Sequence, residues 1–405
     1  MTDIRISVVN TSATGGTFLT PLWFGFHDGE FDLYDRNAPT SAGLESLAED
    51  GDAALLGAEL TAVDTDARGG VVRGAGGVIA PGETTSTIVT VDGRSNGFFD
   101  FASMIIPSND AFIGSGTSIK LFDDDGNFLG ATEVVLSGSD VLDAGTEVNT
   151  EMDAAFINQL GANTGIDENG VVTQHPGFNG SLGHPGGDQI ILGGTNALGQ
   201  TIDPIAADFT QPGATIATIH VNTVNVVDLT GNSNFRATSH DDIVTGSDGR
   251  NIIRGGDGWD ELHGEGGNDH IFGGDGNDLI AGGDGDDVLF GNDGNDRIYG
   301  GDGDDRIRDG AGDDLVIGGT GNDIVLLGGG ADVIVFGVGD GDDIVRGFGD
   351  DDTLLLSFDG IGTVEEALAN ATEVSVGVRF DFGDDSLIVA GVSLEDFGAD
   401  NLLFA

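Results

Sequence analysis

Aspartates spaced nine residues apart are the residues of this chain whose pattern points most directly to chemistry. Between residues 237 and 335, eleven consecutive nonapeptides follow the pattern G-G-x-G-x-D-x-U-x, where U is aliphatic. Carboxylates repeated among glycines, whose carbonyl groups are uncovered, suit Ca²⁺, a hard ion that takes about six to eight oxygen ligands. The sixth position is occupied by Asp242, Asn251, Asp260, Asp269, Asp278, Asp287, Asp296, Asp305, Asp314, Asp323 and Asp332.

The other positions of the repeat predict how these aspartates are held. The eighth position is aliphatic in every repeat, and the fourth is glycine in ten of the eleven. Three residues such as Leu279–Ala281 are predicted to form a short strand with the middle side chain inward, after a six-residue glycine turn. Two nonapeptides then complete one coil, which stacks Asp260 on Asp278 at one strand spacing, ~4.8 Å. Carboxylates that close repel unless a cation lies between them, so we expect calcium in rows.

This pattern resembles the RTX (repeats-in-toxin) family over residues 237–335. The resemblance implies a parallel β-roll that holds rows of Ca²⁺, is disordered in the calcium-poor cytosol and folds outside the cell. It also implies export by type I secretion machinery, which reads an uncleaved carboxy-terminal signal. The resemblance is poorest at the two ends, because Ala237–His240 lacks glycines and Leu327 replaces a first glycine.

Residues 347–405 have another character and are predicted to cap the roll, after an imperfect turn at 339–344. Thr363 begins a capping box that predicts a helix from Glu365 to Asn370. Alternating segments at Val374–Asp381 and Leu387–Val389 predict strands. An uncovered roll end would expose unpaired backbone groups, so a capping element is expected. The apolar end, 401–405, resembles the carboxy termini of type I secretion substrates.

Composition excludes several classes of function. The chain has 405 residues with 70 Asp and Glu against 14 Lys and Arg, a net charge of -56. Nucleic acids and anionic membranes would repel it. It has no cysteine, hence no disulfide or thiolate site. No apolar run approaches the ~18 residues of a membrane span, and Met1–Arg5 lacks the features of a cleavable signal peptide.

Residues 1–229 are predicted to form an antiparallel β-sandwich with small helices in its loops. Asp125-Gly126 and Asn169-Gly170 are hairpin turn signals. Helices are predicted from Ser41 to Asp50 and from Glu151 to Leu160, each followed by glycine. Strands with period-two alternation are predicted at Ile4–Val8, Thr87–Val91 and Thr215–Ile219.

Four segments of this half resemble, in family order, the spondin domain of F-spondin-type matrix proteins: residues 18–27, 42–51, 102–112 and 143–147. The resemblance implies a β-sandwich with one Ca²⁺ held by loops at one end, and a role in extracellular matrix or adhesion. The matching loop carboxylates are Asp110, Asp143 and Glu147; the alternative is that they only cap turns. The chain lacks the cysteines of animal relatives, and its tract 162–214 is longer and glycine-rich.

Two apparent motifs lack the surroundings that their chemistry needs. Gly93–Gly97 matches the G-x-S-x-G pattern of hydrolases, but Phe98–Phe101 is predicted to be a strand, where Ser95 would need a following helix. The run Asp123–Asn127 is similar to part of an EF-hand loop, but its first and twelfth ligand positions carry no carboxylate. A hairpin turn is preferred there.

The sequence therefore predicts a secreted calcium-binding protein that is not an enzyme. Its parts are a spondin-like sandwich (1–229), a linker (230–236), a calcium-binding roll (237–346) and a capping and secretion-signal region (347–405). The function expected is adhesion or matrix binding through an unknown extracellular or cell-surface ligand. The alternatives are a secreted hydrolase and a surface-layer or self-assembling protein.

Overall fold

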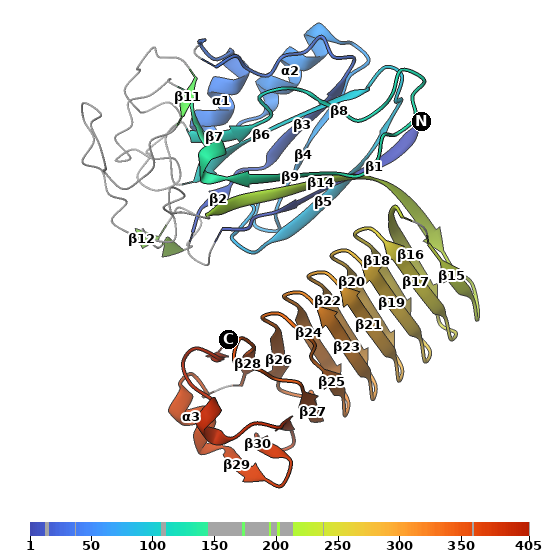
Figure 1. Cartoon of the computed structure of the whole chain (residues 1–405), viewed down its shortest axis with the longest axis vertical. Helices are drawn as coiled ribbons and strands as arrows, with labels where there is room; N and C mark the ends of the chain where they lie inside the picture. Colours follow the sequence, from blue (N-terminus) through green and yellow to red (C-terminus); the bar gives the residue numbers. More distant parts are fainter. Residues whose placement is uncertain are drawn as a thin grey trace. The chain divides into compact units, whose positions relative to one another are not determined.

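A computed structural model describes residues 1–12, 16–36, 38–106, 111–144, 172–174, 194–195, 201–202, 214–237, 239–358 and 360–404. The chain divides into two compact units, Met1–Thr223 and Val224–Ala405. Figure 1 shows antiparallel sheets in the first unit and a stack of short parallel strands in the second. The predicted all-β class, with a roll and a small cap, is confirmed. Among the described residues, no helix is long and apolar enough to cross a membrane.

Two sheets form the first unit. Their strands alternate inward and outward side chains, and the inward Ile4, Phe24, Phe99 and Ile219 belong to one buried apolar cluster between the sheets. One sheet has the order β9 (Thr132–Ser137), β14 (Thr215–Asp228), β1 (Thr2–Val9) and β5 (Thr84–Val91). The other has the order β11 (Thr173–Gln174), β10 (Leu142–Asp143), β7 (Ala111–Gly114), β6 (Phe98–Ile106), β3 (Leu22–His27) and β4 (Arg68–Val72), with β2 (Phe18–Leu19) and β8 (Ile119–Lys120) also on β6.

Two helices cover the outer face of β3 and β6. The predicted helix is confirmed as α1 (Ala42–Asp50), which Ser41 caps by accepting from the N–H of Leu44 and Gly51 ends in the left-handed conformation. A second helix, α2 (Ala54–Val63), was not predicted from the sequence, because its side chains form no clear apolar stripe. The predicted helix 151–160 and the turn Asn169-Gly170 lie outside the described residues. Trp23 belongs to a separate buried cluster that also contains apolar residues of both helices.

Several smaller elements complete this unit. The Asp125-Gly126 hairpin is confirmed, since Gly126 N–H donates to Asp123 O and Asp123 N–H donates to Asn127 O. The remaining elements are the 3₁₀ helix η1 (Gly138–Asp140) and the antiparallel pair β12 (Gly194–Thr195) and β13 (Thr201–Ile202).

The second unit is a β-roll in which strands eighteen residues apart pair in parallel. Leu262 lies beside Ile280, and Ile280 beside Ile298. One sheet contains Val224–Asp228 at the end of β14, followed by β16 (Asp241–Ser247), β18 (Glu261–Glu265), β20 (Leu279–Asp284), β22 (Arg297–Asp302), β24 (Leu315–Thr320), β26 (Val333–Gly337), β28 (Thr353–Ser357) and β32 (Leu402–Phe404). The other contains β15 (Asn234–Arg236), β17 (Ile252–Asp257), β19 (His270–Asp275), β21 (Val288–Asp293), β23 (Arg306–Ala311), β25 (Ile324–Leu326), β27 (Asp342–Arg346) and β31 (Ser386–Ala390).

The strands of the roll are longer than the three residues predicted. The strand β20 continues through Gly282 and Gly283 to Asp284, because the glycines also pair with the next coil, Gly283 with Gly301. At Gly301, a side chain would overlap the backbone oxygen of Gly283 in the coil below, and its φ is 119°. Glycine at this position therefore permits both the positive φ and the close stacking.

A cap closes the last coil. The strands β31 and β32 extend the two sheets by one strand each, and α3 (Val364–Ala369) and η2 (Leu394–Asp396) accompany them. The Thr363 cap is confirmed, since its side chain accepts from the N–H of Glu366. The strand predicted at Val374–Asp381 is present as β30 (Gly377–Asp381), but it begins later than predicted: Val374 ends β29 (Ala371–Val374), which pairs with β30 in antiparallel fashion across a tight turn.

Candidate metal centre

The sixth-position side chains form two rows, one along each edge where the chain crosses between the sheets of the roll. Each of these residues is at most 3% exposed. The first row contains Asp242, Asp260, Asp278, Asp296, Asp314 and Asp332; the second contains Asn251, Asp269, Asp287, Asp305 and Asp323.

Backbone hydrogen bonds hold one oxygen of each stacked aspartate. The N–H of Asp260 donates to Oδ1 of Asp278 at 2.8 Å, and that of Asp278 to Oδ1 of Asp296 at 2.8 Å. The same bond recurs every eighteen residues along both rows, with lengths between 2.6 Å and 3.1 Å. The stacking predicted from the sequence is therefore present.

The second oxygen of these carboxylates is left without a partner. At Asp269, Asp278, Asp287, Asp296, Asp305, Asp314, Asp323 and Asp332, the buried Oδ2 makes no hydrogen bond in the described part of the chain. A buried anionic oxygen without a donor costs free energy comparable to a lost hydrogen bond or more. A cation that coordinates these oxygens would remove that cost.

Backbone carbonyl oxygens lie near several of these free carboxylate oxygens. A side chain added to Gly273 would overlap Oδ2 of Asp278 and lie 2.8 Å from the carbonyl oxygen of Gly291. At Gly282, it would overlap Oδ2 of Asp287 and lie 2.5 Å from the carbonyl oxygen of Gly300. Carboxylate and carbonyl oxygens without nitrogen or sulfur are the donor set that Ca²⁺ prefers.

Burial raises the pKa of these carboxyl groups, and neighbouring carboxylates raise it further. The pKa of Asp278 rises to about 9 because it is buried and because the carboxylate of Asp260 lies beside it. Burial also raises the pKa of Asp305 to about 8, and those of Asp287 and Asp296 to about 7. Without metal, the folded roll therefore holds these groups as ionised carboxylates only at a cost near neutral pH.

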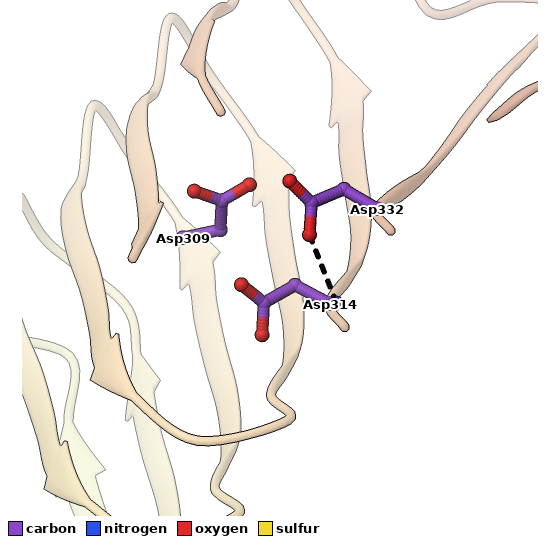
Figure 2. A group of neighbouring side chains, drawn as sticks. All are labelled: Asp309, Asp314 and Asp332. Carbon is purple, nitrogen blue, oxygen red and sulfur yellow. Dashed lines mark hydrogen bonds between the residues drawn. The ribbon is translucent and has the colours of Figure 1, made fainter. Parts of the chain in front are cut away.

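Asp309 adds a carboxylate beside Asp314 and Asp332 of the first row. It is the first residue of its nonapeptide, a position that is glycine in most repeats. Figure 2 shows Asp309, from β23, beside Asp314 and Asp332, with Asp332 accepting the N–H of Asp314 at 3.1 Å. One ligand oxygen from each of the three lies within 4.8 Å of the others. Asp309 is 0% exposed and its Oδ2 has no partner among the described residues. Burial, then Asp332 and Asp314, raise its pKa to about 7.

Three acidic residues of these rows were missed by the sequence prediction. The N–H of Asp323 donates to Oδ1 of Asp343 at 2.8 Å, and that of Asp332 to Oδ1 of Asp352 at 3.0 Å. Both rows thus continue beyond residue 335, but at a spacing of twenty, which a strict nine-residue period does not find. Asp309 could have been noticed as an acidic residue at a glycine position.

The site predicted in the sandwich is only partly covered by the structure. Asp110 and Glu147 lie outside the described residues. Asp143 belongs to β10 and pairs with Ala111 of β7, but its side chain is not among those described. Calcium binding by these three residues therefore stays a prediction.

The sandwich also contains a buried polar network that the sequence did not indicate. His27 and Asp100 are at most 1% exposed, and Nε2 of His27 donates to Oδ2 of Asp100 at 2.8 Å. Ser115 and Ser118 donate to the same carboxylate, and Nδ1 of His27 accepts the N–H of Gly29. Both ring nitrogens are engaged within the fold, so this network ties β3 to β6 and to the segment between β7 and β8 instead of presenting a free base.

The rejected hydrolase motif has the surroundings expected from the sequence. Ser95 lies in a turn, where its N–H donates to the carbonyl oxygen of Asp92. The segment after it is the strand β6 and not a helix.

Comparisons with known proteins match the two units separately. The RTX calcium-binding nonapeptide repeat matches residues 236–271, 263–298, 272–307, 299–334 and 338–358. Spondin_N matches residues 18–157. The chain thus combines a spondin domain with RTX calcium-binding repeats, as the sequence resemblances indicated.

No curated protein matches the chain. Among solved structures, the extracellular lipase LipA from Serratia marcescens is similar at 20% identity and a TM-score of 0.23. That match covers 42% of this chain and 41% of the lipase chain. Likeness at this level carries no argument about the fold or the activity.

Proposed function

We propose that this chain, a spondin domain followed by RTX repeats, is a secreted calcium-loaded protein that binds an extracellular or cell-surface ligand through residues 1–229. The observation that supports calcium binding is the set of eight buried Oδ2 atoms, from Asp269 to Asp332, that make no hydrogen bond among the described residues, together with nearby glycine carbonyl oxygens. The matched Spondin_N model supports an extracellular role for the sandwich. Both matched families are non-catalytic, which supports binding over catalysis.

The proposed mechanism couples folding of the roll to export. In a cytosol with submicromolar Ca²⁺, repulsion among the stacked carboxylates keeps residues 237–346 unfolded, so that the type I secretion machinery can thread the chain. Outside, millimolar Ca²⁺ fills sites of the weak extracellular class, with Kd ~10⁻⁴–10⁻³ M. Because the sites exist only in the folded roll, the free energy of calcium binding becomes free energy of folding.

The proposed ligands fall into two groups. In the sandwich, Asp110, Asp143 and Glu147 hold one further Ca²⁺. In the roll, the ligands are Asp242, Asp260, Asp269, Asp278, Asp287, Asp296, Asp305, Asp314, Asp323 and Asp332, together with glycine carbonyl groups.

Calcium titration of the purified full chain, followed by circular dichroism, tests the roll. We expect a cooperative gain of β signal with Ca²⁺ and little gain with Mg²⁺, which keeps its waters and needs a tighter octahedral site. Asp287→Asn, in the middle of the second row, should shift the midpoint to higher calcium. Asp125→Asn, at the exposed hairpin tip of the sandwich, is the matched control and should not. An unchanged spectrum across the titration would reject calcium-driven folding.

Adhesion is tested with the calcium-loaded full chain on immobilised matrix polysaccharides and on cell surfaces. Retention that is lost in Asp110→Asn with Glu147→Gln, while the roll still responds to calcium, supports binding through the sandwich. Retention that persists in this double variant but disappears with Asp287→Asn would assign binding to the roll instead. Turnover in a panel of hydrolase substrates would favour the enzyme alternative.

A further inference from the structure

A pocket in the first unit lies against a buried hydrogen-bond donor that has no acceptor. Its volume is about 500 Å³, within the range of small-molecule sites. It is enclosed by β3, β4, α2 and the loop between the two helices, and it contains no residue of the proposed calcium sites. Its lining includes Trp23, Asp52, Gly57, Leu60, Val71 and Arg73.

Trp23 supplies the donor. Its side chain is 1% exposed, and its indole Nε1 makes no hydrogen bond in the described part of the chain. Buried indole N–H groups usually find a partner, and a buried donor left unsatisfied costs about 1–3 kcal/mol. An acceptor brought by a ligand would remove this cost.

Gly57 keeps the space beside that indole nitrogen open. It lies inside α2, where glycine costs about 1 kcal/mol relative to alanine. A side chain at Gly57 would meet only Nε1 of Trp23, at 3.8 Å. At Gly70, by contrast, a side chain would lie 2.8 Å from the Phe24 ring. Close packing on Phe24 therefore explains the glycine at position 70. At position 57, the only atom that an added side chain would contact is the unpartnered Nε1 of Trp23.

The remaining groups define the chemistry of the occupant. Arg73 is exposed at the pocket, and its guanidinium makes no hydrogen bond or ion pair with the described residues. Asp50 and Asp52 add carboxylate acceptors, while Leu60 and Val71 add apolar surface. An occupant must therefore both accept and donate hydrogen bonds and also present an apolar face. Two carboxylates against one guanidinium disfavour an anion.

We propose that this pocket binds a neutral polyhydroxylated ligand of the size of a mono- or disaccharide, with a hydroxyl oxygen accepting the Trp23 indole N–H. Sugar hydroxyls serve as donors to Asp52 and as acceptors from Arg73. The C–H face of the ring packs on Leu60 and Val71. This site is separate from the calcium rows and does not depend on them.

The indole N–H signals in ¹H–¹⁵N spectra of the calcium-loaded full chain report directly on Nε1 of Trp23. The chain has two tryptophans, so Trp259→Phe assigns the Trp23 signal. The probes are glucose, galactose, mannose, N-acetylglucosamine and their disaccharides, with glucuronate as the anionic comparison. We expect at least one neutral sugar to shift the Trp23 signal in a saturable way.

Matched variants separate ligand binding from folding. Gly57→Ala should leave the melting temperature unchanged or raise it, but weaken sugar binding by about tenfold or more, as one misplaced methyl group commonly does. Arg73→Gln should also weaken binding, whereas Arg68→Gln, at the other end of the strand that precedes Arg73 and outside the pocket, should not. The proposal is overturned if no neutral sugar moves the signal up to millimolar concentration. It is also overturned if Gly57→Ala leaves the affinity unchanged, or if glucuronate binds more tightly than glucose.

Discussion

Asp309 adds one negative charge to the roll at a position that is glycine in most repeats. At equivalent first positions, such as Gly273 and Gly291, a side chain would overlap the free oxygen of the aspartate five residues later. Asp309 occupies that place and adds a third carboxylate to Asp314 and Asp332. The site therefore gains a ligand for a cation and, without one, gains a further buried like charge.

Replacing Asp309 by glycine should consequently have opposite effects with and without calcium. In chelator, Asp309→Gly should raise the stability of the roll, because one buried unpartnered carboxylate is removed. In calcium, it should weaken the site formed with Asp314 and Asp332 by about tenfold, equivalent to ~1.4 kcal/mol. Calorimetric calcium titration and thermal melts measure the two effects. Asp313→Asn, an exposed neighbour, is the control, and equal effects of the two variants would contradict this assignment.

The same residues show what the sequence could and could not predict about the site. The aspartates of the repeat were found because each stands two residues before an inward aliphatic side chain. Asp343 and Asp352 were missed because twenty residues separate them from Asp323 and Asp332, and only the pairing of backbone N–H groups reveals the row. The free Oδ2 atoms are likewise a result of packing, which periodicity alone does not contain.

At the scale of elements, one coil of the roll depends on aliphatic contacts with the coils on either side. Ile280 is buried between Leu262 and Ile298. Ile280→Ala should lower the free energy of unfolding of the calcium-loaded roll by about 2–5 kcal/mol, the usual cost of such a cavity. Ala281→Ser, one residue on and pointing to the other face, should change it by less than about 0.5 kcal/mol. Denaturant unfolding in saturating Ca²⁺ gives both values.

Acid should partly replace calcium in folding the two rows. The pKa values of Asp278, Asp305 and Asp287 are raised from 3.8 to about 9, about 8 and about 7 in the folded, metal-free roll. When a group has a higher pKa in the folded state than in the unfolded state, protonation stabilises the folded state. This contribution to the free energy of unfolding is complete below the unfolded pKa and is lost as pH rises through the folded pKa. In chelator, the roll should therefore gain β signal as pH falls from mildly alkaline to mildly acidic.

With calcium bound, the pH dependence should have the opposite sign. Protons compete with the metal for the same oxygens, so acidification should weaken calcium binding. Circular dichroism across one pH series, recorded with chelator and with calcium, compares the two states. Loss of β signal on mild acidification in chelator would contradict the pKa directions.

The elements themselves were predictable to different degrees. The helix α1 was recognised because Ser41 and Gly51 mark its ends. The following helix, α2, lacks both a side-chain N-cap and a clear apolar stripe, so tertiary packing of Leu56 and Leu60 on Trp23 stabilises it instead. The roll strands were predicted too short, since the pairing of Gly283 with Gly301 depends on the coil above.

At the scale of the whole molecule, the two units differ in what holds them together. The described part of the sandwich is stabilised by apolar packing between its sheets, with no row of stacked carboxylates. The roll combines a column of aliphatic side chains with two rows of buried acids. Removing calcium should therefore unfold the second unit and leave the core of the first intact.

One tryptophan lies in each unit and can report this difference. Trp23 is 1% exposed in the sandwich, and Trp259 is 9% exposed in the roll. In Trp259→Phe, the remaining emission from Trp23 should stay at the short wavelength of a buried indole when chelator is added. In Trp23→Phe, the emission from Trp259 should shift to longer wavelength and return when calcium is restored. If both signals shift together at the same calcium concentration, the sandwich also needs the metal to keep its core, and the loop carboxylates Asp110, Asp143 and Glu147 become the first residues to replace.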